Sequence, residues 1–530
     1  MSMKKFSLVF LFLLACSQLM AQETMIIFLK DKEQLEPEQL QQNFSERALQ
    51  RRLKNRVQFD QHDWPVTQSY LDLLAEHGKV LQTSRWLNAV KFETETSASV
   101  LQIEFDFISE IQTFSKLTGK STINKWELEE AKALNYGYAD TQALQINANC
   151  LHDLDFTGVG VYVAIIDAGF RGMDTIPYFD SLYLQARLLD SHDFINDSSV
   201  YAYSGHGTSV TSTIVAEGNF PDAFTGTGKD VDLALYVSED VASETQLEEF
   251  NLIAALERCD SVGVDIANIS LGYFEFDDSL TNYIYDDLDG QTTISAIGVT
   301  IAASKGIIVV SSAGNSGPDH ITTPADADSI LSIGAIDGFE NYAWFSGVGP
   351  SFDGRVKPDV VSRGGGSWFI ASDGLLKNGN GTSFSSPIIA GAVACLVQAY
   401  PTRTAQEIIQ MVRESGHQFA APDTLMGYGI PDFCKAFLST PEIVGIESSV
   451  FPIPADDHIT IESAAFNSLD KLTIQLIDLS GRLTLEGKSV AVISNSVVII
   501  TEELKDGFYI LTLSNNSNQP ILQRKILVKH

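Results

Sequence analysis

The chain has few basic side chains for its length. Its 530 residues include 35 Lys and Arg against 68 Asp and Glu, a formal net charge of −33 at pH 7. A nucleic-acid-binding protein needs a basic surface to meet the phosphates, so this balance excludes a simple role of that kind. The balance fits a soluble exported protein.

Long apolar runs are also scarce. One of them, residues 6–15, follows Lys4 and Lys5 and is too short to be a stable bilayer anchor. We therefore predict a signal peptide over residues 1–21, cleaved before Gln22. A lipoprotein-type site that would lipidate Cys16 is the alternative. No later segment is long and apolar enough to cross a membrane, so we expect no transmembrane anchor.

Cysteine is rare, with five in the whole chain. Once Cys16 has left with the signal peptide, Cys150, Cys259, Cys395 and Cys434 allow three pairings if all are bridged. Cys395 lies in an apolar helical run and is equally compatible with a buried free thiol. The sequence leaves the pairing open.

A serine in a short polar segment carries the main chemical signal. Residues 381–387 read Gly-Thr-Ser-Phe-Ser-Ser-Pro, and the apolar run 388–399 behind them predicts a buried helix. Ser383 then falls at a helix start, where unpaired N–H groups and the helix dipole favour a developing negative oxygen. Serine is also a common helix cap, so the assignment needs partners elsewhere.

Two upstream residues supply these partners. Residues 160–166 form an apolar run typical of a fully buried strand, and Asp167 follows it, where an unpaired carboxylate would be costly. His206 lies between two glycines at the start of another apolar helix. Histidine can take the serine proton near neutral pH, and an aspartate can fix its tautomer. His192 is interpreted as part of a polar loop over 191–199.

The segments around Asp167, His206 and Ser383 resemble the three signature blocks of the subtilisin-like serine peptidases (subtilases). Their order along the chain is also one of the known triad orders. Ala168 departs from the family pattern, because it lacks the hydroxyl that usually follows the aspartate. Ser209 and Phe384 depart as well, but none of the three changes removes a catalytic group.

Two further segments extend the resemblance. Residues 311–317 resemble the block with the family's oxyanion asparagine, which implies that Asn315 and the Ser383 backbone N–H hold the oxyanion. Residues 268–272 resemble the strand that pairs with substrate, which implies substrate binding at Ser270, Leu271 and Gly272.

Apolar strands and helices alternate in the middle of the chain. Strand-like runs at 233–237, 266–270 and 307–313 and a helical run at 246–259 predict an α/β domain over 125–440. Such alternation implies a subtilisin-like parallel sheet with helices on both faces. Asp167, His206 and Ser383 can then meet at its carboxyl edge.

The preceding region has a different composition. Residues 22–124 hold 12 Lys and Arg against 15 Asp and Glu, whereas residues 125–445 hold 14 against 43. The first region combines a strand-like run at 25–29 with a helical one at 46–54. We interpret residues 22–124 as a small α+β inhibitory propeptide; an accessory domain that stays attached is the alternative.

Short alternating strands fill residues 446–530 and predict a small all-β sandwich. The expected strands are 459–462, 472–478, 497–501, 508–513 and 521–528. This region resembles the C-terminal sorting domain of type IX secretion, although Phe451 and Ile453 depart from its usual opening. The resemblance implies export across the outer membrane of a Gram-negative bacterium, to the medium or the cell surface.

The sequence thus predicts a secreted serine endopeptidase, made as a precursor, that acts on proteins or peptides. Its expected partners are these substrates, its own propeptide and the type IX machinery. A weak or inactive surface binding protein on the same scaffold is the alternative. We expect no cofactor in the chemistry and assign no metal; Asp193, Asn196 and Asp197 offer calcium-type oxygens but fit a solvated turn.

Overall fold

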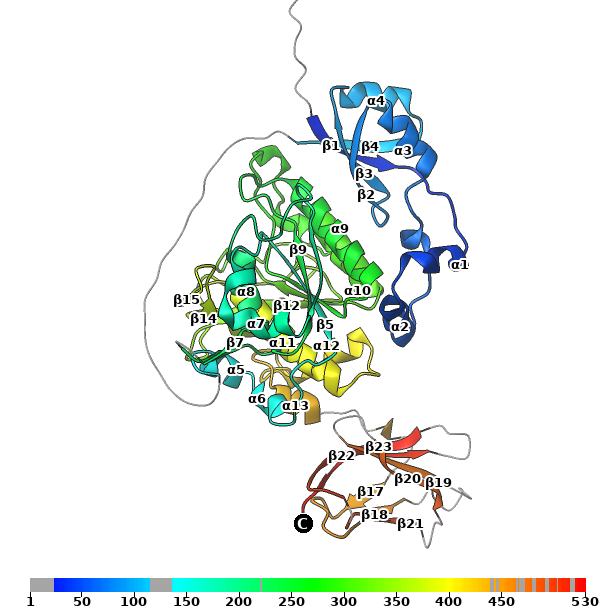
Figure 1. Ribbon diagram of the computed structural model, residues 1–530, viewed down its shortest axis with the longest axis vertical. Coiled ribbons are helices and arrows are strands. Elements are labelled where there is room, and N and C mark those ends of the chain that lie inside the picture. Colours follow the sequence, from blue (N-terminus) through cyan, green and yellow to red (C-terminus); the bar gives the residue numbers. More distant parts are fainter. Residues whose placement is uncertain are drawn as a thin grey trace, which may run out of the picture. The chain divides into compact units, whose positions relative to one another are not determined.

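The computed structural model describes residues 23–114, 136–219, 222–438 and most of 443–530. The undescribed positions within the last stretch are 445–447, 464–465, 467–471, 479–482, 491–494, 503 and 515–519. The expected signal peptide with Cys16 and the junction at residues 124 and 125 lie outside the described residues. The chain divides into two compact units, Met1–Gln34 with Gln61–Ser115 and Leu35–Asp60 with Lys116–His530 (Figure 1).

The first unit is an α+β domain, as predicted for this region. Its elements alternate as β-α-β-β-α-β, and its antiparallel sheet has the order β2-β3-β1-β4. Apolar side chains of β1, including Met25 and Ile27, pack against both helices in one buried cluster. The elements are β1 (Glu23–Leu29), α3 (Gln68–Ala75), β2 (Gly78–Ser84), β3 (Ala89–Thr94), α4 (Ala98–Glu104) and β4 (Ile108–Thr113).

The second unit is built on a seven-stranded parallel sheet of order β13-β12-β11-β10-β5-β9-β6. Helices lie on both faces, which confirms the predicted subtilisin-like architecture (Figure 1). The strands are β5 (Tyr162–Asp167), β6 (Leu188–Asp193), β9 (Asp232–Val237), β10 (Ile266–Ile269), β11 (Ile308–Ser312), β12 (Leu331–Ile336) and β13 (Val360–Arg363).

The strand order reverses next to β5. From β5 the chain runs to β6 and β9 on one side, then crosses to β10 and continues to β13 on the other. The carboxyl ends of β5 and β10 therefore flank a topological switch point, the place where open α/β sheets bind ligands.

Strand β6 corrects the interpretation of His192 as part of a polar loop. His192 lies in this edge strand, which among the described strands pairs with β9 alone. Its side chains are more exposed than those of the central strands, so its sequence lacks the continuous apolar run of a buried parallel strand.

The helices of the second unit cover the sheet and its edges. Side chains of α8, α11 and α12 share one buried cluster with Val163 and Ile165 of β5, while α9 and α10 pack on each other, β5 and β11. The main helices are α5 (Asp140–Leu144), α6 (Asn149–His152), α7 (Asp180–Leu184), α8 (His206–Val215), α9 (Gln246–Val262), α10 (Ile294–Ser304), α11 (Thr382–Ala399), α12 (Ala405–Ser415) and α13 (Phe433–Leu438).

Helix α11 corrects the expectation that no later segment could cross a membrane. By length and composition alone it could, with a mean hydropathy of 1.4 over 18 residues. However, 83% of this window is buried in the fold, where the helix contacts β10 to β13. Its apolar character is that of a core helix.

Residues 35–60 belong to the second unit, although they lie within the range expected for the propeptide. Helix α2 (Glu46–Lys54) packs on α9, and α1 (Pro37–Leu40) precedes it. Arg51 and Arg52 are buried and both donate to the Asp260 carboxylate. Arg51 also donates to the Val264 carbonyl at 2.7 Å. This buried ion pair joins the segment to α9.

The C-terminal region is all-β, as predicted. One sheet has the order β16-β23-β22-β19-β20, the other β17-β18-β21, and apolar residues of both form one core. Strands β16, β17 and β20 were not among the predicted ones. The strands are β16 (Ile443–Val444), β17 (Ser449–Phe451), β18 (His458–Glu462), β19 (Leu472–Asp478), β20 (Leu483–Val490), β21 (Ser496–Ile500), β22 (Gly507–Ser514) and β23 (Pro520–Val528).

One disulfide joins the two ends of the catalytic region. Cys150 in α6 and Cys434 in α13 are bonded with their Cα atoms 5.5 Å apart, across 284 positions of sequence. Cys259 and Cys395 are buried free thiols. The possibility that all four cysteines are bridged is therefore wrong, and the free-thiol interpretation of Cys395 is confirmed.

Replacing both bridged cysteines by serine is expected to lower the free energy of unfolding by about 2–5 kcal/mol, because the closed loop is long. Thermal melting with and without a thiol reductant measures this loss. The wild-type melting temperature should fall in reductant, whereas that of the double variant should not change. A Cys395→Ala control should keep the sensitivity; loss of it there, or its persistence in the double variant, would contradict the prediction.

Candidate active site

Asp167 ends β5 with its side chain fully buried. Its Oδ1 accepts hydrogen bonds from the Ala168 backbone N–H at 2.7 Å and from His206 Nδ1 at 2.8 Å. Within the described part of the chain its Oδ2 has no hydrogen-bond partner. Ala168 has no side-chain hydroxyl to support the Asp167 carboxylate, but its backbone N–H donates a hydrogen bond to it.

His206 is the first residue of α8. Gly207 donates to the Gly169 carbonyl at 3.0 Å, and a Cβ at Gly207 would lie 2.6 Å from that oxygen, so the close approach requires glycine. Burial acts to lower the pKa of His206, but the charge and hydrogen bond of Asp167, with Glu239, outweigh it and raise this pKa above 6.5. The imidazole is still 36% exposed, so a substrate can reach it.

Ser383 lies in the first turn of α11 and is bonded to the segment after β10. Its Oγ donates to the Ser270 carbonyl at 3.3 Å, and Ser270 Oγ donates to the Ser383 carbonyl at 3.0 Å. The next residue, Phe384, has its ring centroid 6.4 Å from that of His206. The structure therefore brings Asp167, His206 and Ser383 to the same edge of the sheet.

A chain of buried polar side chains supports this arrangement. Ser386 Oγ donates to Asn268 Oδ1 at 2.6 Å, and Asn268 Nδ2 donates to Ser270 Oγ at 3.0 Å. Neither Asn268 nor Ser386 was among the predicted site residues. An asparagine inside an apolar strand was the available signal, because a buried amide is costly without partners.

The Asn315 side chain is held in one orientation. Its Oδ1 accepts hydrogen bonds from the Thr382 backbone N–H at 3.0 Å and from Thr382 Oγ1 at 3.1 Å. The same hydroxyl is 3.1 Å from the Gly314 carbonyl, so its one proton is shared between the two acceptors; the Gly314 backbone has φ +90°. Because both bonds use the amide oxygen, the Nδ2 group of this exposed residue is left to donate elsewhere.

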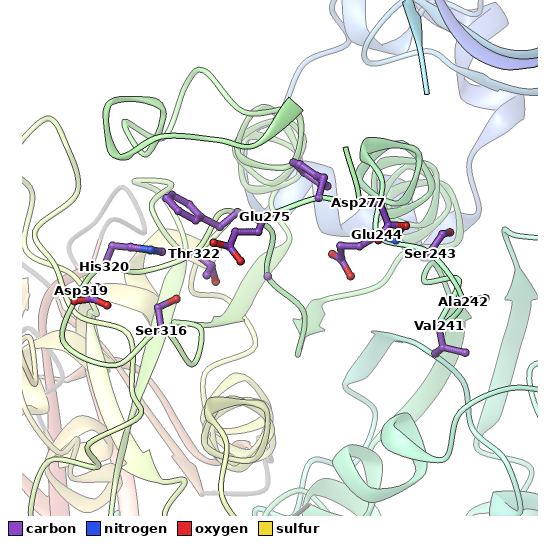
Figure 2. A pocket seen from close by; sticks show the side chains of 13 residues that line it. Val241, Ala242, Ser243, Glu244, Glu275, Asp277, Ser316, Asp319, His320 and Thr322 are labelled. Carbon is purple, nitrogen blue, oxygen red and sulfur yellow. Dashed lines mark hydrogen bonds between the residues drawn. The ribbon is translucent and has the colours of Figure 1, made fainter. Parts of the chain in front are cut away.

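The three predicted substrate-binding residues have different contacts. Ser270 is hydrogen-bonded to Ser383, and the Leu271 carbonyl accepts a hydrogen bond from Ser312 Oγ at 3.3 Å. Gly272 lines a cavity of about 720 Å³, shown in Figure 2. The segment 270–272 thus runs from the candidate nucleophile to the cavity.

In the loop considered for calcium, the Asp193 carboxylate accepts hydrogen bonds from nearby residues of the same loop. Asp193 Oδ1 accepts from the Ile195 N–H, while Oδ2 accepts from Ser198 and Tyr203. Asn196 Nδ2 also donates to the Tyr203 hydroxyl. These bonds fit the interpretation of this loop as a turn.

Three family models match different parts of the chain. The subtilase family matches residues 158–429, and a Peptidase S8 propeptide domain of Bacteroidota matches residues 24–129. A secretion system C-terminal sorting domain matches residues 449–529.

Individual relatives are similar over the catalytic region. Subtilisin DY of Bacillus licheniformis is 27% identical over 283 residues, 52% of this chain and 89% of that protein. The membrane-bound transcription factor site-1 protease of Rattus norvegicus is 29% identical over 49% of this chain, but over only 23% of that protein. The crystal structure of MycP1 with its propeptide removed is 22% identical, with a TM-score of 0.46 over 56% of this chain and 97% of that one.

These matches define a subtilisin-like serine protease with a propeptide domain and a secretion sorting domain. Because the subtilase model spans more than half of its residues, the chain belongs to the subtilase family.

Removing the Ser386 hydroxyl is expected to lower kcat about fivefold, because a hydrogen bond of about 1 kcal/mol that positions Ser270 and Ser383 is lost. Asn268→Ala should have at least this effect, and the double variant should be little worse than Asn268→Ala alone, since both act through one chain of bonds. Steady-state kinetics on a fluorogenic peptide provides the measurement.

Ser385→Ala is the matched control, because the buried Ser385 hydroxyl donates only within α11, to the Thr382 carbonyl at 2.9 Å. It should reduce stability without the loss in kcat. Equal effects of Ser385→Ala and Ser386→Ala on kcat would show that the Asn268 network has no positioning role.

Proposed function

We propose that this chain is a secreted endopeptidase that hydrolyses peptide bonds through an Asp167–His206–Ser383 triad and an acyl-enzyme. The observation that carries the proposal is the 2.8 Å bond between Asp167 Oδ1 and His206 Nδ1 at the switch point of the sheet. Ser383 and Asn315 reach the same edge from α11 and from the loop after β11.

In the first step Ser383 Oγ attacks the substrate carbonyl carbon while His206 Nε2 takes its proton. The 3.3 Å bond from Oγ to the Ser270 carbonyl must break, so the side chain turns toward His206 as substrate binds. Asp167 accepts the hydrogen bond from Nδ1–H throughout, which fixes the tautomer and stabilises the imidazolium.

The tetrahedral oxyanion needs donors that are already oriented. Asn315 Nδ2 and the Ser383 backbone N–H serve this role, and the amino end of α11 adds its dipole. His206 then gives its proton to the leaving amine. Water, activated by the same imidazole, hydrolyses the acyl-enzyme. The chain's own residues supply the nucleophile, the base and the oxyanion donors, so the proposed chemistry uses no cofactor.

The substrate would bind as an extended strand. Residues within 241–244 and 272–277 line the cavity together. The Asp277 N–H donates a hydrogen bond to the Glu244 carbonyl and so joins the two segments. Two facing backbone edges can hold a peptide between them by main-chain hydrogen bonds. Proteins and peptides are therefore the proposed substrates.

The flanking domains support synthesis as a zymogen and export. The propeptide match suggests that the N-terminal domain is this enzyme's inhibitory partner. The sorting-domain match supports delivery by the type IX machinery to the medium or the surface of a Gram-negative bacterium.

Ser383→Ala is expected to abolish peptide hydrolysis and leave the fold intact, because the nucleophile is lost and a small side chain replaces it. A serine-directed fluorophosphonate should label the wild-type protein at Ser383 and fail to label the variant; melting curves check the fold. Unchanged hydrolysis by the variant would refute the assignment. A mature form, freed of its propeptide, that is neither labelled nor active would favour the binding-protein alternative.

The acidic limb of the kcat/KM profile is expected to have its midpoint above pH 6.5. His206 must be neutral to act as base, and because its pKa is raised, activity should be lost as pH falls through that raised value. A substrate without titrating groups and circular dichroism at each pH exclude other causes. A midpoint at or below pH 6.5, or a rate that is flat from about pH 8 to about pH 4, would contradict this role.

A further inference from the structure

The cavity beside Gly272 is wide enough for substrate side chains. It measures about 720 Å³ and is lined by residues within three segments, 241–244, 272–277 and 316–322. In the view of Figure 2, Glu275 lies on the side of Thr322 and Ser316, with Glu244 and Asp277 across from them.

The lining of the cavity is strongly acidic. No lysine or arginine is among the described residues that line it, but four carboxylates are: Glu244, Glu275, Asp277 and Asp319. His320 is its one basic side chain. The His320 ring packs on Phe274 at an interplanar angle of 32°, with centroids 3.9 Å apart, and its Nδ1 is hydrogen-bonded to the Ile321 carbonyl at 2.6 Å. The described lining therefore has an excess of carboxyl groups over basic ones.

The carboxyl groups around Glu244 lie close together. Burial, then Asp277 and Glu249, raise the pKa of Glu244 to about 7. Oxygens of Glu239, Glu244 and Glu248 all lie within 4.8 Å of one another. Glu239 and Glu248 accept hydrogen bonds from nearby side-chain and backbone donors. In the described part of the chain no such donor contacts the Glu244 carboxylate. Burial also raises the pKa of Glu239 and Glu248, so bound protons relieve part of this repulsion, and a bound cation would relieve more of it.

A second observation points to a ligand at the other end of the cavity. Thr322 is only 8% exposed and lines the cavity, yet its Oγ1 has no hydrogen-bond partner among the described residues. A Cβ at Gly272 would lie 2.2 Å from this oxygen, and one at Gly314 would lie 2.4 Å from it. The two glycines thus leave room for the hydroxyl, which can accept from an ammonium or guanidinium group.

We propose that this cavity selects substrates with a lysine or arginine side chain on the amino-terminal side of the scissile bond. The cation binds between Glu275 and Thr322 at one end of the cavity or beside Glu244 and Asp277 at the other, while the backbone binds along Gly272. The inference rests on the proposed function, because it assumes that Ser383 attacks a peptide placed along this segment.

The first test is a digest of a proteome-derived peptide library by the mature enzyme, with the cut sites read by mass spectrometry. Lysine and arginine should be enriched in at least one of the positions before the cut, and Asp and Glu depleted there. No enrichment of basic residues, or enrichment of acidic ones, would overturn the inference.

The second test compares two fluorogenic peptides that differ only by lysine or norleucine at the enriched position. The kcat/KM ratio should favour lysine by about tenfold, and either Glu275→Gln or Glu244→Gln should lower it severalfold. Asp286→Asn is the control: it removes one negative charge from an exposed residue outside the cavity lining, so the ratio should not change. A ratio near one in the wild type, or equal effects of all three variants, would overturn the inference.

Two controls separate this inference from its rivals. If fluorophosphonate labels Ser383 and both peptides are cleaved equally, only the selectivity is wrong; if Ser383 is not labelled and neither is cleaved, the proposed function fails as well. The rival occupant is a divalent cation on Glu239, Glu244 and Glu248. The lysine preference should persist in EDTA; its loss there would assign the charge to metal binding instead.

Discussion

The structure depends on how one buried carboxylate is compensated. Asp167 is fully buried at the end of β5, where an unpaired charge would be strongly destabilising. His206 and the Ala168 N–H share its Oδ1, so the ends of β5 and α8 are fixed relative to each other. The same bond that makes this burial tolerable raises the pKa of His206. Folding and the basicity of the candidate catalytic histidine therefore have a common cause.

The two edges of the sheet have different roles. Arg47 bonds to the Gly160 carbonyl before β5, and Arg51 bonds to the Val264 carbonyl before β10, both at the amino edge. Asp167 ends the first of these strands and Ser270 follows the second, both at the carboxyl edge, about 20 Å away for strands of this length. Residues 35–60 can therefore hold to the catalytic region without occupying the site.

The sequence predicts the parts of this arrangement that leave a local pattern, and it does not predict contacts between residues that are far apart in the chain. The strand ending at Asp167 and the helices starting at His206 and Ser383 were predictable, because a buried parallel strand and a core helix leave continuous apolar runs. Strand β6 was missed, since an edge strand needs no such run. The partners of Asn268 lie far along the chain, at Ser386, and the Cys150–Cys434 pairing spans 284 positions; no local pattern encodes either.

The acidic lining of the cavity could not be predicted from the sequence for a related reason. Glu244 and Asp277 belong to segments about thirty residues apart, and the excess of acidic residues over the whole catalytic region did not predict where the charge gathers. In the fold the Glu244 N–H donates to Asp277 Oδ2 at 3.1 Å, which places both carboxylates at one end of the cavity. A low-dielectric wall around like charges concentrates their field toward the opening. Acidic residues that are spread along the sequence are therefore gathered, in the fold, at the cavity that a peptide would enter.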